Sequence, residues 1–356
     1  MKTITRTTYN LLLQNQRRNF SHALTGAKVL VAGCKGQIGL PLVHALCKEV
    51  GIDNVVAADI SDKSVDLPCK FERLDVSDFN TYEKIVKDHK ITYIVHLAAI
   101  LSALGERFPD RANTVNVNGF MHAINLARDH KCKIYCPSSI AVFGGDQFPK
   151  VNTPDDTILQ PETIYGVTKV FNEMMGTYYH KKFGVDFRAI RYPGVISSEK
   201  YEFNGTTDYS TQIFFEALEK GRYKCFLGPK SDLPMIYIDD CIQGTVDFMK
   251  ADSNKLNRRI YNMAGISFNP EQLAVSLKKI LPDFQIQYEP DFRQKIADAW
   301  PKSIDDSNAK KDWNWSYDIS VDDLAIKIFE GIDPKYKTHL LNNKTGFDAK
   351  LKVVKA

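Results

Sequence analysis

The sequence predicts an α/β fold: a doubly wound parallel sheet in the first part of the chain and a smaller lobe in the second. Short apolar, β-branched runs alternate with longer stretches of helical periodicity, which is the pattern of βαβ units. The chain has 356 residues, of which 44% are hydrophobic, enough for one large domain or two closely joined lobes. We expect the sheet domain to span 27–195 and the lobe to span 196–334, with segments that return to the sheet, among them the apolar run 233–238. Residues 335–356 form a lysine-rich tail.

The first 26 residues carry four basic side chains and no acid. Without those four, basic and acidic residues are equal in number, so the body has no electrostatic footprint for nucleic acid. An arginine-rich, hydroxyl-rich and acid-free start is typical of a mitochondrial transit peptide, and we predict a matrix location. A disordered basic tail is the alternative. No apolar run approaches the ~20 residues needed to cross a bilayer, and the seven scattered cysteines indicate reduced thiols.

Three glycines stand between the first apolar run, 28–32, and an amphipathic stretch that begins at residue 40. In such a strand–loop–helix unit, Gly33 permits a tight turn and Gly36 lets the backbone approach a pyrophosphate. Gly39 allows the helix to pack closely on the strand. The sheet is therefore predicted to be of the Rossmann type and to bind a dinucleotide. The expected contacts in this loop are Gly33, Gly36, Gln37, Ile38 and Gly39.

A second apolar run, 54–58, ends at Asp59 and Ile60. An acid at this place can accept hydrogen bonds from both ribose hydroxyls and would repel a 2′-phosphate, so we predict NAD rather than NADP. Lys35 in the glycine loop offsets part of that repulsion. An ordinary loop acid is the alternative interpretation of Asp59.

Two further runs extend the predicted cofactor site. The run 71–76 is interpreted as a short strand ending at Asp75 and Val76, where the carboxylate could meet an adenine amino group. The run 91–99 is interpreted as a buried strand that ends in Leu97, Ala98 and Ala99, small enough for a cofactor to lie close to the backbone.

Tyr165 and Lys169 are four residues apart in a stretch with helical periodicity, so they share one helix face. A free tyrosine has a pKa near ~10, and a cation one turn away favours the phenolate that a base requires. Tyr178 and Lys182 have the same spacing. The two pairs differ in what precedes them: Ser139 ends a predicted strand 26 residues before Tyr165, and parallel sheets gather their sites at strand carboxyl ends. We therefore interpret Tyr178 and Lys182 as a surface pair.

These motifs, in this order from about residue 27 to 194, resemble those of the extended short-chain dehydrogenase/reductase family. The resemblance implies that Tyr165 is the acid/base, that Lys169 binds the nicotinamide ribose and lowers the cost of the phenolate, and that Ser139 orients the substrate hydroxyl. It also implies that a loop after the strand at 185–190 touches the nicotinamide. The cofactor-binding residues expected beyond the glycine loop are Asp59, Ile60, Asp75, Val76, Leu97, Ala98, Ala99, Asn116, Tyr165, Lys169, Tyr192, Pro193 and Val195.

Within that family, the stretches 97–102, 192–197, 204–209, 296–307 and 312–315 resemble the members that oxidise L-threonine. The resemblance implies oxidation of its 3-hydroxyl to 2-amino-3-oxobutanoate with formation of NADH. It also implies a homodimer, formed through the helix of Tyr165 and the helix after the fourth strand, and a downstream 2-amino-3-oxobutanoate CoA ligase. The expected substrate contacts are Ser102, Ser139, Tyr165, Thr206 and Trp300. Ser102 and Thr206 could instead be caps or turn hydroxyls, and Trp300 a core aromatic.

Two other functions are kept as alternatives. A nucleotide-sugar epimerase or dehydratase uses the same tyrosine, lysine and strand-end hydroxyl, but the stretch 195–222 is short and mostly uncharged, which favours a smaller substrate. A non-catalytic NAD-binding sensor or scaffold would not need Ser139, Tyr165 and Lys169 together. We predict no metal site, because the histidines fall on separate predicted elements and no metal-ligand spacing is found.

Overall fold

The computed structural model describes residues 24–62, 65–145, 147–201, 203 and 205–337. Most of the predicted transit peptide and of the lysine-rich tail therefore lies outside the described residues. Leu24 is described and is only 4% exposed, and it packs in the main hydrophobic core. The folded body thus begins before residue 27, the predicted boundary.

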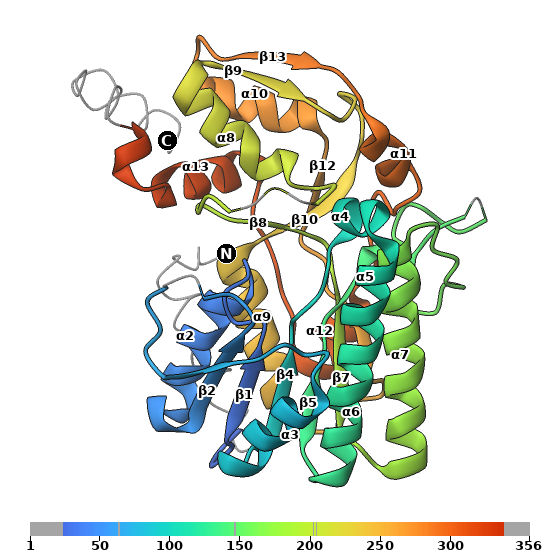
Figure 1. Cartoon of the computed structure of the whole chain (residues 1–356). Helices are drawn as coiled ribbons and strands as arrows, with labels where there is room; N and C mark the ends of the chain where they lie inside the picture. Colours follow the sequence, from blue (N-terminus) through green and yellow to red (C-terminus); the bar gives the residue numbers. More distant parts are fainter. Residues whose placement is uncertain (1–23, 63–64, 146, 202, 204, 338–356) are drawn as a thin grey trace, which may run out of the picture.

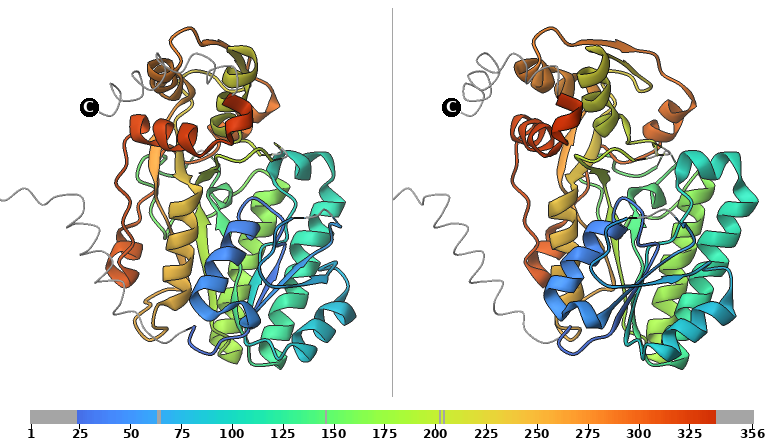
Figure 2. Two further views of the ribbon diagram at one scale, coloured as in Figure 1. Left: turned by 90° about the vertical axis from the view of Figure 1, so that its left-hand side faces the viewer. Right: turned by 60° about the vertical axis from the view of Figure 1, so that its left-hand side comes forward.

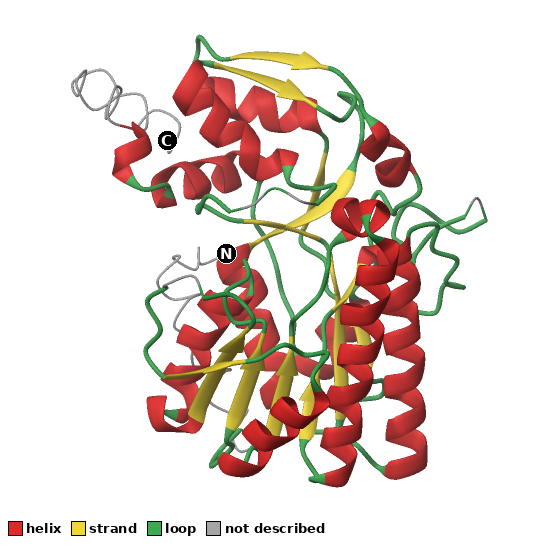
Figure 3. Ribbon diagram, viewed as in Figure 1, coloured by secondary structure: helices red, strands yellow, loops and turns green. Residues whose placement is uncertain are grey.

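A parallel sheet forms the centre of the larger domain (Figures 1 and 3). Its strands follow the order β11-β7-β5-β4-β1-β2-β3, and the short β6 also pairs with β7. Every pairing in this sheet is parallel. The strands are β1 (Val29–Ala32), β2 (Val55–Asp59), β3 (Lys70–Arg73), β4 (Tyr93–His96), β5 (Lys133–Tyr135), β6 (Ser138–Ser139), β7 (Phe187–Tyr192) and β11 (Ile260–Asn262).

Helices cover both faces of this sheet, which is the doubly wound arrangement that the alternating runs predict. Residues of β1 point alternately into two cores: Val29 and Val31 into one, Leu30 and Ala32 into the other. Figure 2 shows α2 and α9 on one face and α6 and α7 on the other. The helices around the sheet are α2 (Gly39–Val50), α3 (Phe79–Asp88), α4 (Ser102–Arg107), α5 (Pro109–Asn113), α6 (Gly119–Asp129), α7 (Ile164–Phe183), α9 (Ile238–Lys250) and α12 (Ser307–Trp313).

The smaller lobe lies beyond the carboxyl ends of the strands (Figure 1). It contains a three-stranded sheet in the order β12-β10-β8 and a two-stranded sheet of β13 and β9. These strands are β8 (Gly194–Ile196), β9 (Arg222–Cys225), β10 (Leu233–Tyr237), β12 (Ile266–Phe268) and β13 (Gln285–Tyr288). The helices of the lobe are α8 (Tyr209–Lys220), α10 (Pro270–Ile280), α11 (Phe292–Asp298) and α13 (Val321–Gly331). Within the described ranges, no helix is both long and apolar enough to span a bilayer.

Two details of the predicted sheet are wrong. The apolar run 233–238 was expected to return to the main sheet, but it forms β10 of the separate three-stranded sheet, and the strand that joins the main sheet is β11, beside β7. A buried strand reads the same in either sheet, so the sequence pattern does not distinguish them. The strand expected at 71–76 ends at Arg73, because Asp75 starts a turn by accepting hydrogen bonds from the backbone and hydroxyl of Ser77.

Candidate active site

A cavity of about 240 Å³ lies between the carboxyl edge of the sheet and the lobe. It receives residues from the glycine loop, from the ends of β4, β6 and β7, from α7 and from two segments of the lobe. The predicted site residues that line it are Gly33, Gly36, Gln37, Ile38, Gly39, Leu97, Ala99, Ser102, Ser139, Tyr165, Lys169, Tyr192, Pro193, Val195, Thr206 and Trp300. The topology therefore brings these sixteen distant residues into one place.

The glycine loop has the geometry that a bound diphosphate requires. Gly33 has a φ of +89°, and a Cβ there would lie 2.6 Å from the backbone nitrogen of Ala98. A Cβ on Gly39 would collide with the carbonyl oxygen of Gly33. At Gly36, by contrast, a Cβ would meet only that carbonyl oxygen, at 3.6 Å. Gly33 and Gly39 thus serve close packing, and Gly36 leaves open backbone at the start of α2, where a pyrophosphate would fit.

Asp59 lies at the end of β2, outside the cavity, and its carboxylate holds the glycine loop. One oxygen accepts the backbone N–H of Lys35 at 2.9 Å, and the other accepts the N–H of Ser61 at 2.9 Å. The Lys35 ammonium donates to the carbonyl of Ser61 at 2.7 Å and lies 4.1 Å from the centroid of the Phe71 ring. Asp59 and Lys35, the two charged residues predicted to affect the choice between NAD and NADP, are therefore adjacent in the structure.

The cysteine of the glycine loop is inert. Burial, with the Asp59 charge beside it, raises the pKa of the Cys34 thiol to about 12, so this thiol stays protonated at neutral pH.

Five other predicted cofactor contacts also lie outside the cavity. Ile60 and Asp75 are exposed, and Val76 is buried, with its carbonyl 3.0 Å from Nδ1 of His122. Ala98 donates its backbone N–H to Ala32 at 3.1 Å.

Asn116 is the fifth, and it is 1% exposed on a π-helical turn, Thr114–Asn118. Its amide exchanges two hydrogen bonds with the backbone of Ile100, at 2.8 and 3.0 Å, and donates to the Thr168 hydroxyl at 3.1 Å. These bonds tie the segment after β4 to the helix α7.

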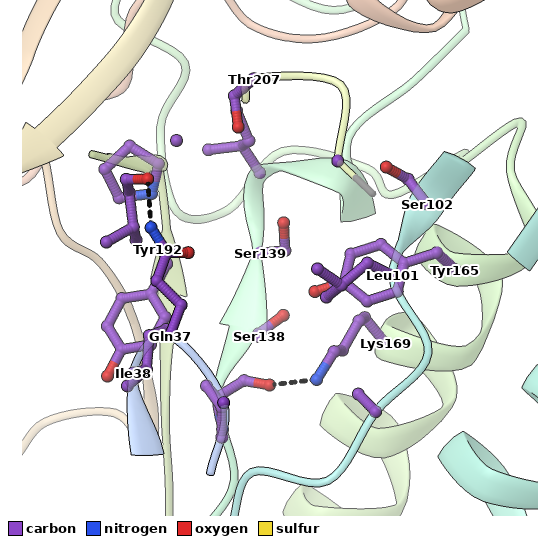
Figure 4. Close-up of a pocket in the computed structure, with 18 of the residues that line it drawn as sticks. Gln37, Ile38, Leu101, Ser102, Ser138, Ser139, Tyr165, Lys169, Tyr192 and Thr207 are labelled. Atoms are coloured by element: carbon purple, nitrogen blue, oxygen red, sulfur yellow. Dashed lines mark hydrogen bonds between the residues drawn. The ribbon is translucent and has the colours of Figure 1, made fainter. Parts of the chain in front are cut away.

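Ser139, Tyr165 and Lys169 meet at one end of the cavity. Figure 4 shows the two α7 side chains facing the serines at the end of β6. Lys169 is 4% exposed, its ammonium donates to the carbonyl of Pro137 at 2.7 Å, and it lies 5.6 Å from the centre of the Tyr165 ring. The Ser139 oxygen accepts the N–H of Ala141 at 3.2 Å, which leaves its own hydrogen free to donate. A hydroxyl donor, a phenol and a cation so arranged can exchange a proton with a substrate hydroxyl.

A polar group from the lobe faces this end of the cavity. The Ser102 and Thr206 hydroxyl oxygens are 3.3 Å apart, so these two predicted contacts meet. Trp300 is 6% exposed and lines the same cavity. Gln37, from the glycine loop, donates to the carbonyl of Val195 at 3.0 Å (Figure 4). This bond links the dinucleotide loop directly to the segment that leads into the lobe.

Gly194, in the loop expected to touch the nicotinamide, also lines the cavity. Seven further lining residues were not predicted: Leu101, Pro137, Ser138, Ile140, Gly205, Thr207 and Asp208. Asp208 matters most, because it brings a carboxylate that is only 6% exposed to a cavity whose other polar groups are mainly hydroxyls. It accepts the N–H of Gly205 at 2.6 Å and the Tyr201 hydroxyl at 3.2 Å. The signal in the sequence was its place next to Thr206 and Thr207 in a loop that opens a helix.

The second tyrosine–lysine spacing lies away from the cavity. Tyr178 is 50% exposed on α7, and its ring contacts those of Tyr179 and Phe183.

In the part of the chain that the structure describes, no three histidine, cysteine, aspartate or glutamate side chains are grouped so as to hold a metal ion. The seven cysteines are all free.

Comparisons with known proteins agree with this geometry. An L-threonine 3-dehydrogenase of mitochondria from Bos taurus is 43% identical over 301 residues, which are 84% of this chain and 80% of that protein. The crystal structure of L-threonine dehydrogenase from Phytophthora infestans is 44% identical, with a TM-score of 0.84 over 87% of this chain and all of the other. A monomeric L-threonine 3-dehydrogenase from a metagenome is 41% identical, with a TM-score of 0.82 over 87% of this chain and 99% of its own.

The model of one protein family matches residues 29–264, well over half of the chain. That range contains the glycine loop, Ser139, Tyr165 and Lys169. The chain therefore belongs to the NAD dependent epimerase/dehydratase family.

Proposed function

We propose that this protein oxidises the 3-hydroxyl of L-threonine with NAD⁺, giving 2-amino-3-oxobutanoate and NADH. The observation that carries the proposal is the meeting of Ser139, Tyr165 and Lys169 with the Ser102–Thr206 hydroxyl pair in one small cavity. Relatives that are more than 40% identical and are named as threonine dehydrogenases support the choice of substrate. In this assignment, 27–195 binds the cofactor and 196–334 binds the substrate.

Tyr165 is the group that removes the proton from the substrate hydroxyl. The Lys169 ammonium, 5.6 Å from the ring centre, favours the phenolate by Coulomb attraction. Ser139 donates its free hydrogen to the substrate oxygen and so orients the carbon–oxygen bond. NAD⁺, when bound, supplies the hydride acceptor. Lys169 also binds the nicotinamide ribose, for which its ammonium has further N–H donors besides the one bonded to the carbonyl of Pro137.

The charged groups of the amino acid are held between the sheet domain and the lobe. Ser102 and Thr206 offer hydroxyl donors for the carboxylate, and the buried Asp208 offers a negative charge for the ammonium. Trp300 closes the cavity as an apolar wall. The hydroxyl pair and the buried Asp208 carboxylate suit the charged groups of an amino acid, which favours threonine over the nucleotide sugar that the alternative epimerase function would require.

The residues expected to hold the adenosine half of the cofactor lie past the cavity, at the end of β2 and after β3. We propose that Asp59 binds the ribose hydroxyls there and that Ile60, Asp75 and Val76 flank the adenine, as the family resemblance implies. Leu97 and Ala99 would border the nicotinamide half, with Ala98 and Asn116 holding the segment after β4 in place behind them, and Tyr192, Pro193 and Val195 would form its far wall.

We further propose a homodimer formed through α7. Val167, Met174 and Tyr178 are 49%, 65% and 50% exposed on this helix, and Phe171 and Met175 continue the same stripe. The spacing of these residues places them on one helix face, which is typical of a surface that packs on another helix. Light scattering coupled to size-exclusion chromatography tests this. A monomer, as in the metagenomic relative, would contradict it.

We also propose that the protein works in the mitochondrial matrix, as the acid-free N-terminus and the mitochondrial relative indicate. The oxo product would be consumed there by a 2-amino-3-oxobutanoate CoA ligase. Import of the full chain into isolated mitochondria, compared with a chain that begins at Leu24, tests the location.

The enzymatic proposal is tested with purified protein, NAD⁺ and either L-threonine or a UDP-sugar. We expect NADH absorbance to rise with L-threonine and the UDP-sugar to be unchanged. Turnover of the UDP-sugar without NADH formation from threonine would contradict the proposal. Binding of NAD⁺ without turnover of either compound would instead favour the sensor alternative.

A further inference from the structure

A buried carboxylate lies on the same face of α7 as the proposed acid/base. Tyr165, Lys169 and Glu173 follow at intervals of four residues, so the three side chains lie one above the other along the helix. Glu173 is 3% exposed, although it carries a charge. The proposed chemistry leaves it without a role.

Glu173 is held by two partners from the sheet. Arg191, in β7, donates from Nε to one carboxylate oxygen and from Nη2 to the other, each at 2.8 Å. The Ser138 hydroxyl donates to the first of these oxygens at 2.5 Å. Ser138 directly precedes Ser139, and Arg191 directly precedes Tyr192, so both partners are chain neighbours of residues that line the cavity.

The remaining guanidinium nitrogen of Arg191 contacts a loop that borders the lobe. Its Nη1 donates to the carbonyl of Asp155 at 2.8 Å. The carboxylate of Asp155 accepts the N–H of Asn262 at 2.6 Å and the amide of Asn308 at 2.9 Å. Two residues earlier, Thr153 forms a β-bridge with Ile304, four residues after Trp300. Arg191 thus connects the catalytic helix, the serine strand and the loop that borders the substrate lobe.

A buried ion pair of this kind fixes the relative position of its partners more reliably than it stabilises the fold. Removing two charges from water is costly, and a buried ion pair often offers no gain over apolar side chains of similar size. A bidentate carboxylate–guanidinium contact does, however, fix the distance and orientation of its two partners. Here the partners are the face of α7 that carries Tyr165 and the strand ends next to Ser139.

We propose that the Glu173–Arg191 ion pair positions Ser139 relative to Tyr165 and Lys169, and so sets the rate of the chemical step. This inference rests on the proposed function of those three residues. Glu173 touches neither substrate nor cofactor: it acts through Ser138 and Arg191. A displacement of roughly 1 Å between the groups that share a proton is enough to lower a rate ~10²-fold.

A positioning role and a merely structural role predict different kinetics. Loss of stability alone would lower Tm and leave kcat unchanged, whereas misplacement of Ser139 would lower kcat with KM nearly unchanged.

The test compares wild type, Glu173→Gln, Ser138→Ala and a control, Asp186→Asn. Asp186 accepts from Arg188 at 3.0 Å just before β7, so the control breaks a second, partly buried ion pair next to the same strand without touching Glu173 or Ser138. We expect Glu173→Gln to lower kcat by at least about tenfold with KM for threonine and Kd for NAD⁺ within about twofold. Ser138→Ala should lower kcat by a smaller factor than Glu173→Gln does. It provides the test of the inference if Glu173→Gln does not fold. Asp186→Asn should lower Tm and leave kcat unchanged.

If wild type oxidises threonine and either Glu173→Gln or Ser138→Ala keeps the wild-type kcat, the inference is overturned while the proposed function stands. If wild type formed no NADH from threonine, the proposed function would fail instead. The inference would then be decided by crystal structures of wild type and Glu173→Gln. An unchanged distance between the Ser139 and Tyr165 hydroxyl oxygens would overturn it, and a changed distance would support it.

Discussion

The hydroxyl oxygens of Ser102 and Thr206 are 3.3 Å apart, although the residues are 104 positions apart in the chain. Ser102 begins α4, just past the strand β4 of the large sheet, and Thr206 precedes α8 in the lobe. The pair therefore joins the two parts of the molecule over the cavity. A substrate carboxylate held by both hydroxyls would be held by both parts at once.

Loss of either hydroxyl should weaken threonine binding. We expect Ser102→Ala and Thr206→Val each to raise KM for threonine about tenfold, because a hydrogen bond to a charged group contributes about 1.5–3 kcal/mol. The double variant should raise KM by less than the product of the two single increases, since the hydroxyls share one ligand. Ser77→Ala, whose hydroxyl bonds Asp75 outside the cavity, is the control. Steady-state kinetics measures KM for threonine in each variant. An unchanged KM in both single variants would refute this role.

Tyr165→Phe should abolish most turnover while NAD⁺ still binds. General acid–base catalysis contributes about 10²- to 10⁴-fold, and kcat should fall by that factor. The matched control is Tyr178→Phe, on the same helix and with the same spacing to a lysine, but 50% exposed. Its kcat should equal that of wild type. Near-normal kcat in Tyr165→Phe, with NADH absorbance as the readout, would remove Tyr165 from the mechanism.

Asp59→Ala should lower the preference for NAD⁺ over NADP⁺. The variant removes the negative charge that opposes a 2′-phosphate and leaves the Lys35 ammonium beside it. We expect the ratio of kcat/KM values to fall at least about tenfold, on the scale of one charge-assisted hydrogen bond. Asp62→Ala, which removes an acid that is 75% exposed, should leave the ratio unchanged. An equal ratio in wild type and Asp59→Ala would argue against the ribose contact.

His96 should make the fold sensitive to acid. The residue is 2% exposed, Tyr82 lies 3.3 Å from its Nδ1, and its Nε2 has no hydrogen-bond partner among the described residues. Burial, with smaller effects of the Lys169 and His122 charges, lowers its pKa from 6.5 to about 3. Between these values the unfolded chain binds a proton that the folded chain does not. Stability is therefore full above pH 6.5 and falls as pH falls toward 3.

The size of this effect follows from linkage. One such histidine costs about 2 kcal/mol of the free energy of unfolding between pH 7 and pH 5. Urea unfolding at several pH values, for wild type and His96→Asn, isolates the contribution. Parallel pH curves for the two proteins would show that His96 is not its source.

Local spacing predicted the parts of the site that local structure determines. The glycines of the loop and the four-residue interval of Tyr165 and Lys169 follow from single turns of backbone, and both lie on the cavity. Ser139 followed from the rule that parallel strands gather their ends at one edge. For these residues the sequence alone was sufficient to predict that they lie on the cavity.

Packing between distant segments was not predictable in the same way. The pattern of β10 does not say which sheet it joins, and the turn at Asp75 depends on one side-chain contact to Ser77. In the sequence, Asp208 is an ordinary residue before a helix. Only the fold of the lobe shows that it lies on the cavity. The contact between Glu173 and Arg191 depends on how α7 lies on β7, which no interval in the sequence reveals.

The most direct test of the central claim follows the hydrogen on C3 of the substrate. L-threonine with deuterium at C3 is incubated with the purified protein and NAD⁺, and the reduced cofactor is analysed by mass spectrometry. The proposed function predicts NADH that carries the deuterium on its nicotinamide ring. Reduced cofactor without deuterium, or no reduced cofactor at all, would contradict it.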